Sequence, residues 1–213
     1  MVLLNSMKKI LLLLYLVLAG CKGGENQNSD IVEGDVMECT CPHTALLIQP
    51  YNSVTVEEAG KLKQELDRFL SKYVIIDSIV VLSPMQLPDT LKNDAKTRFR
   101  ADKILGFQQA KIKEDVTIMG YIHEDVSLPY KGKSDWGVLG LSFMGQRNCV
   151  ISTFRVRNSE QNLWKVAAHE FFHAFLGYPH CPEDNDNCIM KDAKGHPDFD
   201  VKNDLCDYCK TQI

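Results

Sequence analysis

The 213-residue sequence predicts an α/β fold, with a mixed β-sheet and helices packed against it. Apolar runs rich in β-branched residues, typical of strands, alternate along the chain with segments whose apolar residues recur at helical spacing. This alternation favours a sheet covered by helices, and we expect the helices on one face of it. The C-terminal segment, rich in Gly, Pro and Asp, has little apolar pattern and predicts a small, looser subdomain.

The predicted elements begin after residue 43. Residues 45–48 form a short apolar run that predicts the first strand, and Thr55 with Glu58 forms a capping box at the start of a helix. Asn158 and Ser159 are the expected N-cap residues of the last long helix. We expect further strands at 74–82, 116–122, 136–143 and 149–156, and a second helix at about 93–107.

Residues 1–20 predict a signal peptide that is not part of the fold. Lys8 and Lys9 precede an apolar run at 10–19, which is too short to span a bilayer. The run closes with Leu-Ala-Gly-Cys at 18–21, which resembles the lipobox of bacterial lipoproteins, whose cysteine is acylated after cleavage. An ordinary secretory peptide would leave Cys21 without a role, so we expect lipidation of Cys21.

The remaining chain predicts a tether followed by one domain. Residues 21–43 begin with a polar stretch rich in Gly and Asn that suits a flexible lipidated tether, and residues 44–213 can form a sizeable core. We therefore expect a monomer in the bacterial cell envelope that meets the membrane only through its lipid anchor. The net charge of −4 and the lack of a basic patch argue against nucleic acid as a partner.

The most informative motif is His169-Glu170-Phe171-Phe172-His173. Residues four apart lie on one face of a helix, so His169 and His173 can direct two imidazoles at one ion. Glu170 lies beside the first ligand, where its carboxylate can take a proton from a metal-bound water. This arrangement is typical of zinc metalloproteases; the alternative is an amphipathic helix with two ordinary histidines.

His180 is the expected third ligand of the same ion. Gly177 is a good helix stop and Pro179 prevents the helix from resuming, so the chain can fold back toward the first two histidines. Three histidines with one open position are typical of catalytic zinc. The sequence thus predicts an enzyme that hydrolyses peptide bonds in a peptide or protein substrate, with a zinc-activated water and Glu170 as general base. A non-catalytic binding protein on the same scaffold is the alternative.

Cysteines close to the C-terminus predict a second metal site. Two separated cysteines and a Cys-x-x-Cys pair suit a tetrahedral structural zinc that would clamp the C-terminal subdomain. Two disulfides are the alternative, because exported proteins meet an oxidising compartment. The four residues are Cys181, Cys188, Cys206 and Cys209.

A separate pair of cysteines lies in the expected tether. Cys39 and Cys41 are too close in sequence to hold one ion by themselves. We expect a disulfide here instead, with Cys149 as a candidate partner.

With these motifs, the C-terminal third of the chain resembles the archaemetzincin family. That family's pattern H-E-x-x-H-x-x-G-x-x-H-C is matched by H-E-F-F-H-A-F-L-G-Y-P-H-C, except for one extra residue before Gly177. Its Cys-x-Met and Cys-x-x-Cys follow here as Cys188-Ile189-Met190 and residues 206–209. Similar stretches at 98–102, 120–125 and 151–155 extend the likeness over roughly residues 45–210.

The resemblance implies a metzincin-like fold with one catalytic and one structural zinc. The three histidines would hold the catalytic ion, with Glu170 as general base, and the four cysteines would hold the second ion. Met190 would lie in a tight turn beneath the catalytic metal. We expect a π-bulge or a longer last helical turn to absorb the extra residue, so that His180 still binds.

Overall fold

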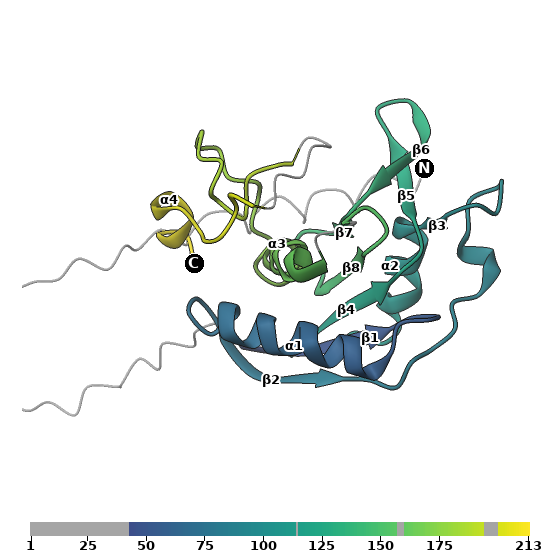
Figure 1. The fold of residues 1–213 in the computed structure, drawn as a ribbon, viewed down its shortest axis with the longest axis horizontal. Coiled ribbons are helices and arrows are strands. Elements are labelled where there is room, and N and C mark those ends of the chain that lie inside the picture. Colours follow the sequence, from purple (N-terminus) through teal and green to yellow (C-terminus); the bar gives the residue numbers. More distant parts are fainter. Residues whose placement is uncertain (1–42, 114, 157–159, 194–199) are drawn as a thin grey trace, which may run out of the picture. The chain divides into compact units, whose positions relative to one another are not determined.

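The computed structural model describes residues 43–113, 115–156, 160–193 and 200–213 (Figure 1). The expected signal peptide, Cys21 and nearly all of the expected tether lie outside these residues, as do Asn158 and Ser159. Among the residues described, no helix is both long and apolar enough to cross a membrane.

Five strands form the central sheet in the order β2-β1-β4-β8-β7 (Figure 1). Four of them run parallel: β1 (His43–Pro50), β2 (Ile75–Val81), β4 (Val116–Ile122) and β8 (Asn148–Ser152). The fifth, β7 (Gly140–Ser142), pairs antiparallel with β8 and forms one edge of the sheet. The sequence predicted the first three parallel strands closely, whereas β8 ends at Ser152 instead of continuing to Val156.

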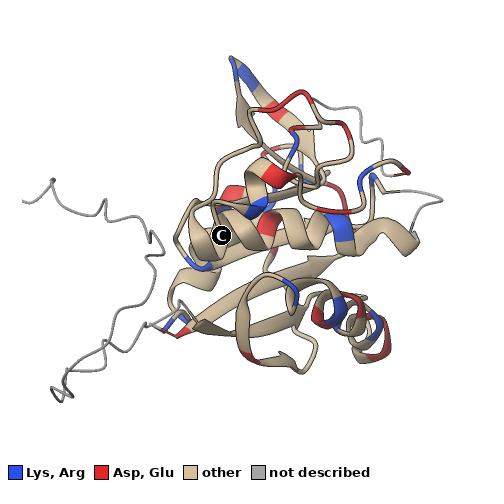
Figure 2. Cartoon of the chain, turned by 90° about the vertical axis from the view of Figure 1, so that its left-hand side faces the viewer, with Lys and Arg blue, Asp and Glu red and all other residues tan. Residues whose placement is uncertain are grey.

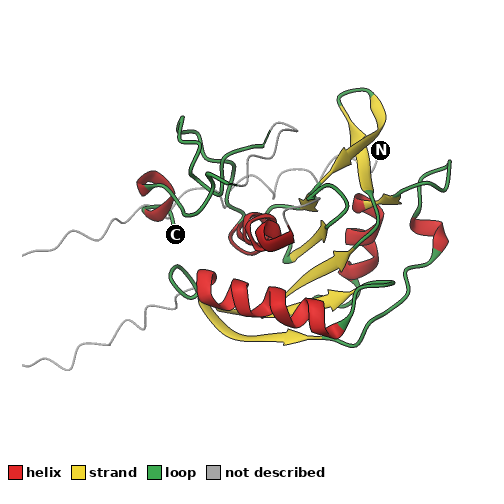
Figure 3. Ribbon diagram, viewed as in Figure 1, coloured by secondary structure: helices red, strands yellow, loops and turns green. Residues whose placement is uncertain are grey.

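Helices pack on both faces of this sheet, which corrects the expectation of a single covered face (Figure 3). Helices α1 (Val56–Leu70) and α3 (Leu163–Leu176) share a core with Met119 and Tyr121 of β4. Helix α2 (Ala101–Gln109) instead packs with Ile122, the next residue of β4. Successive residues of a strand point to opposite faces, so the two cores lie on opposite sides of the sheet.

Helix α1 begins where its capping box predicts. The Thr55 hydroxyl accepts a hydrogen bond from the Glu58 backbone N–H, and the Glu58 carboxylate accepts one from the Thr55 backbone N–H. Two otherwise unpaired backbone donors are thereby satisfied. The apolar stripe Leu62, Leu66, Phe69 and Leu70 is buried against the sheet and α3.

A second, three-stranded sheet accounts for the main errors in the predicted elements. Its order is β3 (Phe99–Arg100), β5 (Val126–Tyr130) and β6 (Lys133–Val138). The strand expected at 136–143 is divided between β6 in this sheet and β7 in the central one. The helix expected from residue 93 starts only at Ala101, after a turn and β3.

The described residues of the C-terminal segment, 177–193 and 200–213, contain little regular structure, as the composition predicts. A short 3₁₀ turn (Glu160–Asn162) leads into α3, whose N-cap position is Asn162 rather than Asn158 or Ser159. After α3 the chain forms turns and ends with the single-turn helix α4 (Asp207–Lys210). This segment lies beside α3, away from the three-stranded sheet (Figure 1).

Candidate metal centre

Helix α3 presents the first two predicted ligands, His169 half-buried and His173 buried. Phe171 and Phe172 are fully buried, and the Phe172 ring meets Phe69 and Tyr73 edge-on at centroid distances of 6.4 and 6.3 Å. This packing fixes the rotation of the helix about its axis. His169 and His173 consequently share one side, with their Nε2 atoms 3.0 Å apart.

The end of α3 brings His180 to the same place. Gly177 adopts a left-handed conformation with φ 66°, and its N–H still bonds to the His173 carbonyl at 3.1 Å. Because α3 remains a regular helix up to this cap, the extra residue lengthens the last turn and forms no π-bulge. The His180 ring lies 4.8 Å from the His173 ring and 5.2 Å from that of His169, measured between centroids.

The three histidines have the donor chemistry of a zinc site. Their candidate ligand nitrogens all lie within 4.8 Å of one another. The backbone carbonyls of Ile189 and Tyr178 accept hydrogen bonds from Nδ1 of His169 and His173, at 2.8 Å in the first case. Each proton is thereby held on Nδ1, which leaves the Nε2 lone pair for a metal. Tetrahedral zinc separates two ligand nitrogens by about 3.3 Å, close to the distance seen here.

Burial keeps the imidazoles of His169 and His173 in the neutral form that metal binding requires. The pKa of His169 is lowered to about 3, mainly by burial and next by the neighbouring His173. The pKa of His173 is also lowered, again mainly by burial. His180 is exposed, and within the described chain its ring nitrogens have no hydrogen-bond partner, so it is the least constrained of the three.

Glu170 is held next to the histidines by contacts that the sequence did not reveal. Its side chain is only 8% exposed, and its Oε2 accepts a 2.7 Å hydrogen bond from the Ser142 hydroxyl in β7. A Cβ on Gly140 would approach Oε1 to 2.9 Å, so the absence of a side chain there makes room for the carboxylate. Burial raises the pKa of Glu170 to about 7, against the lowering effect of the Ser142 bond.

A small cavity of about 60 Å³ adjoins His169 and Glu170. Leu139, just before β7, and Ile189 contribute apolar walls, and the side chain of Lys165 also lines it.

The four predicted cysteines form a second cluster. Their sulfurs all lie within 4.8 Å of one another, and the Cys181–Cys206 and Cys188–Cys209 distances are both 3.5 Å. All four are free thiols in the structure. Four thiolates around zinc would have sulfur separations of about 3.8 Å, so this arrangement fits one tetrahedral ion better than two disulfides.

The segment 188–190 joins the two clusters. Cys188 contributes a thiol to the second cluster, and the next residue, Ile189, accepts the His169 hydrogen bond described above. The Met190 carbonyl accepts a 2.8 Å hydrogen bond from the N–H of Cys181, the residue that follows His180. The Met190 side chain is fully buried in the core shared with α3.

Cys149 does not serve the disulfide that the sequence suggested. Its thiol is free and completely buried in the core beneath α3, and burial holds its pKa well above the ordinary value. Cys39 and Cys41 lie outside the described residues.

Comparison with known proteins places the chain near archaemetzincins. No family model matches the sequence. The archaemetzincin of Halobacterium salinarum is 27% identical over 150 residues, which cover 63% of this chain and 82% of that protein. The archaemetzincin of Haloquadratum walsbyi is 25% identical over 146 residues, or 62% of this chain and 80% of the relative.

Solved structures share the fold. The archaemetzincin from Archaeoglobus fulgidus, complexed with malonate, has a TM-score of 0.63 at 23% identity, over 80% of this chain and 100% of that one. The archaemetzincin from Methanopyrus kandleri has a TM-score of 0.62 at 19% identity, over 80% of this chain and 93% of that one. A zinc-dependent peptidase from Methanocorpusculum labreanum has a TM-score of 0.60 at 18% identity, over 79% of this chain and 99% of that one. The chain is thus similar to archaemetzincins in sequence and has their mixed α/β fold.

Proposed function

We propose that this protein is a zinc-dependent peptidase whose catalytic ion is held by His169, His173 and His180. The observation that carries the proposal is the convergence of three imidazoles on one point, two of them with Nδ1 bonded to backbone carbonyls, beside a buried carboxylate. The sequence relatives, which are archaemetzincins, and the structural neighbour described as a zinc-dependent peptidase support the same class of activity.

The reaction assigned to this site is addition of water to a peptide carbonyl followed by cleavage of the C–N bond. Zinc bound by the histidines would polarise the carbonyl and lower the pKa of water to about 7. Glu170 takes one proton from the attacking water and delivers it to the nitrogen of the leaving amine.

Two contacts orient Glu170 for this task. The Ser142 hydroxyl donates to Oε2, and Gly140 leaves space beside Oε1. Both residues belong to β7, the free edge of the central sheet. A peptide added to this edge as an extended strand would pass beside the carboxylate, which supports β7 as the substrate-binding strand.

We assign the four cysteines to a second, structural zinc ion. The ion would hold the C-terminal subdomain, which has few apolar residues of its own, against α3. It would also fix the 188–190 segment and hence the carbonyl that orients His169.

Replacement of Glu170 tests the proposed chemistry. We expect Glu170→Gln to keep its zinc and to lose peptidase activity by a factor of about 100 or more, because the proton acceptor is removed while the ligands remain. Glu57→Gln, an exposed substitution on α1, is the matched control and should keep full activity. The measurement is hydrolysis of a peptide library alongside zinc content; equal rates for Glu170→Gln and the wild type would contradict the proposal.

A further inference from the structure

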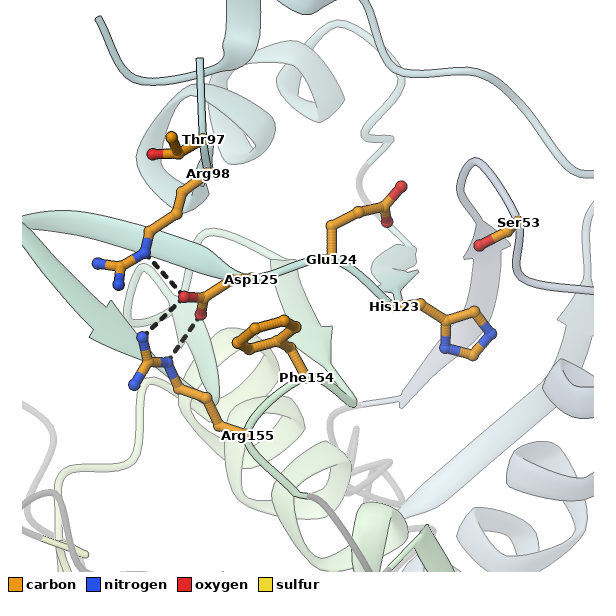
Figure 4. Close-up of a pocket in the computed structure, with 8 residues that line it drawn as sticks. All are labelled: Ser53, Thr97, Arg98, His123, Glu124, Asp125, Phe154 and Arg155. Atoms are coloured by element: carbon orange, nitrogen blue, oxygen red, sulfur yellow. Dashed lines mark hydrogen bonds and ion pairs between the residues drawn. The ribbon is translucent and has the colours of Figure 1, made fainter. Parts of the chain in front are cut away.

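A large cavity lies at the carboxyl ends of the parallel strands, apart from the histidine cluster (Figure 4). From β1 the chain crosses through α1 to β2 on one side, and from β2 it returns through α2 to β4 on the other. The carboxyl ends of β1 and β4 therefore flank a topological switch point, where open α/β sheets generally bind ligands. The cavity volume is about 750 Å³, within the range of small-molecule sites.

Two arginines are fixed in this cavity by one buried carboxylate. Asp125, with a side chain only 7% exposed, accepts two 2.8 Å hydrogen bonds from Nε and Nη2 of Arg155. Its Oδ2 is also 2.8 Å from Nε of Arg98, so the guanidiniums lie on either side of Asp125 (Figure 4). Arg98 makes a further bond of 3.1 Å to Asp135. These bonds hold both side chains in place before any ligand arrives.

The arginines keep donors for an additional acceptor. Within the described chain, Nη2 of Arg98 and Nη1 of Arg155 have no hydrogen-bond partner, and both side chains are about one-third exposed. The other charged groups of the cavity do not contact the arginines. Glu124 accepts a bond from Asn52 at Oε1, its Oε2 has no hydrogen-bond partner among the described residues, and its side chain points away from the arginines (Figure 4). His123 contacts Thr153 and Glu58. Guanidinium donors fixed in this way suit a carboxylate.

The proposed peptidase chemistry leaves three stretches of the sequence unexplained, and all three meet here. The stretches at 98–102, 120–125 and 151–155 contribute Arg98, then Asp125 with its two preceding residues, then Phe154 and Arg155. The Phe154 ring, 39% exposed, adds an apolar wall next to the arginines. Residues far apart in the sequence thus meet in one cavity that contains none of the proposed zinc ligands.

The arginine pair is within reach of a peptide bound at β7. A Cβ on Gly137 would lie within 2 Å of the Arg155 guanidinium, and a Cβ on Gly140 would lie within 3 Å of the Glu170 side chain. These glycines are three positions apart in the chain, so the Arg155 guanidinium lies no more than about 18 Å from the Glu170 carboxylate. A peptide antiparallel to β7 would direct its C-terminal end toward Gly137, and about five residues would cover this distance.

We propose that Arg98 and Arg155, held by Asp125, bind the C-terminal carboxylate of short peptides that lie along β7. This inference rests on the proposed peptidase function for the origin of its ligand. It deepens that function by naming the substrate class: short peptides with a free C-terminus, cleaved within about five residues of that end.

The test is calorimetric binding of two N-acetylated penta-alanine peptides, one ending in a carboxylate and one in a carboxamide. The protein is the zinc-loaded full chain carrying Glu170→Gln, so that the peptide is not cleaved. We expect the carboxylate peptide to bind about tenfold more tightly. Arg98→Gln should abolish this difference, and Arg68→Gln, an exposed arginine on α1, is its matched control.

A second variant keeps the test valid if Arg98→Gln unfolds, since that change removes one of the two arginine partners of buried Asp125. Ser53 is exposed, lines the cavity and makes no contact with the arginines, so Ser53→Glu should preserve folding and repel the carboxylate. Equal binding of the two peptides, or a carboxylate preference that survives both variants, would overturn the inference, as would acetate binding as tightly as the peptide. Peptide hydrolysis is measured separately: carboxylate-dependent binding without hydrolysis would refute the proposed function alone.

Discussion

At the level of single residues, Glu170 is governed by two opposing influences. Burial favours its neutral form, while the Ser142 hydroxyl favours the carboxylate, and burial dominates because none of the described residues pairs a cation with this group in the metal-free protein. Asp125 is equally buried, but two arginines surround it and compensate its charge. The two buried carboxylates thus differ in their partners and not in their burial.

The raised pKa of Glu170 predicts a pH-dependent effect on stability. In the metal-free folded protein the pKa of Glu170 is about 7, whereas the value in the unfolded chain is 4.5. The folded state therefore loses stability as the pH rises from 4.5 toward 7. Glu170→Gln removes this loss. We expect the difference in the free energy of unfolding, variant minus wild type, to be about 2 kcal/mol larger at about pH 8 than at about pH 5.

Urea unfolding in the presence of a chelator measures this difference. Glu57→Gln serves again as the control, because its carboxylate is exposed and forms only a surface pair with Lys61. A gain of the same size at both pH values would show that the effect on stability does not come from ionisation of Glu170.

At the level of elements, helix α3 depends on the segment after it. The Ile189 carbonyl orients His169, the Tyr178 carbonyl orients His173, and the Cys181 N–H bonds to Met190 immediately after His180. We therefore expect the proposed structural ion, by holding this segment together, to position the three histidines. The two candidate zinc sites would then be mechanically coupled although they share no ligand.

This coupling predicts that damage to the cysteine cluster weakens the histidine site. We expect Cys188→Ser to lose the structural ion and to lower the affinity of the remaining site for zinc by about tenfold, in the range typical for loss of metal-orienting contacts. Zinc affinity by competition with a chelating dye is the measurement. Cys149→Ser, a buried cysteine outside the cluster, is the control; an unchanged affinity in Cys188→Ser would disprove the coupling.

At the level of the whole molecule, local signals in the sequence predicted the elements that depend on local chemistry. The capping box of α1 and the β-branched strand at 116–122 are confirmed within a residue. The helix expected from residue 93 failed because the Asn93 side chain accepts bonds from the N–H groups of Thr97 and Arg98, which closes a turn instead. Strand β5 escaped detection because it is short and contains Pro129.

The candidate sites were predictable to different extents. Helical spacing and the stop at Gly177 were sufficient to indicate the three histidines, because the ligands lie on one helix and the turn after it. Ser142 and Gly140 could not be inferred, since only the placement of β7 at the sheet edge brings them to Glu170. The arginine pair could not be inferred from the sequence either, because Arg98 and Arg155 come together only where the two sheets meet. Figure 2 shows acidic and basic segments interspersed over the fold, so charge alone does not mark either site.

The N-terminal prediction concerns the molecule's place in the cell. If Cys21 carries a lipid, the full chain expressed in a bacterium should fractionate with membranes, and Cys21→Ser should release it, because the acyl chains supply the membrane affinity. Cys39→Ser leaves the lipobox intact and is the matched control. Membrane fractionation with labelled palmitate measures both; an unlabelled wild-type protein would refute lipidation.

The most direct test of a three-histidine catalytic site is zinc content measured together with peptide hydrolysis in the wild type and His180→Ala. We expect two zinc ions per chain in the wild type, one in the variant, and hydrolysis only by the wild type. His180 is exposed, so its replacement should leave the fold intact. Equal zinc content in the two proteins, or a fully active variant, would contradict a three-histidine catalytic site.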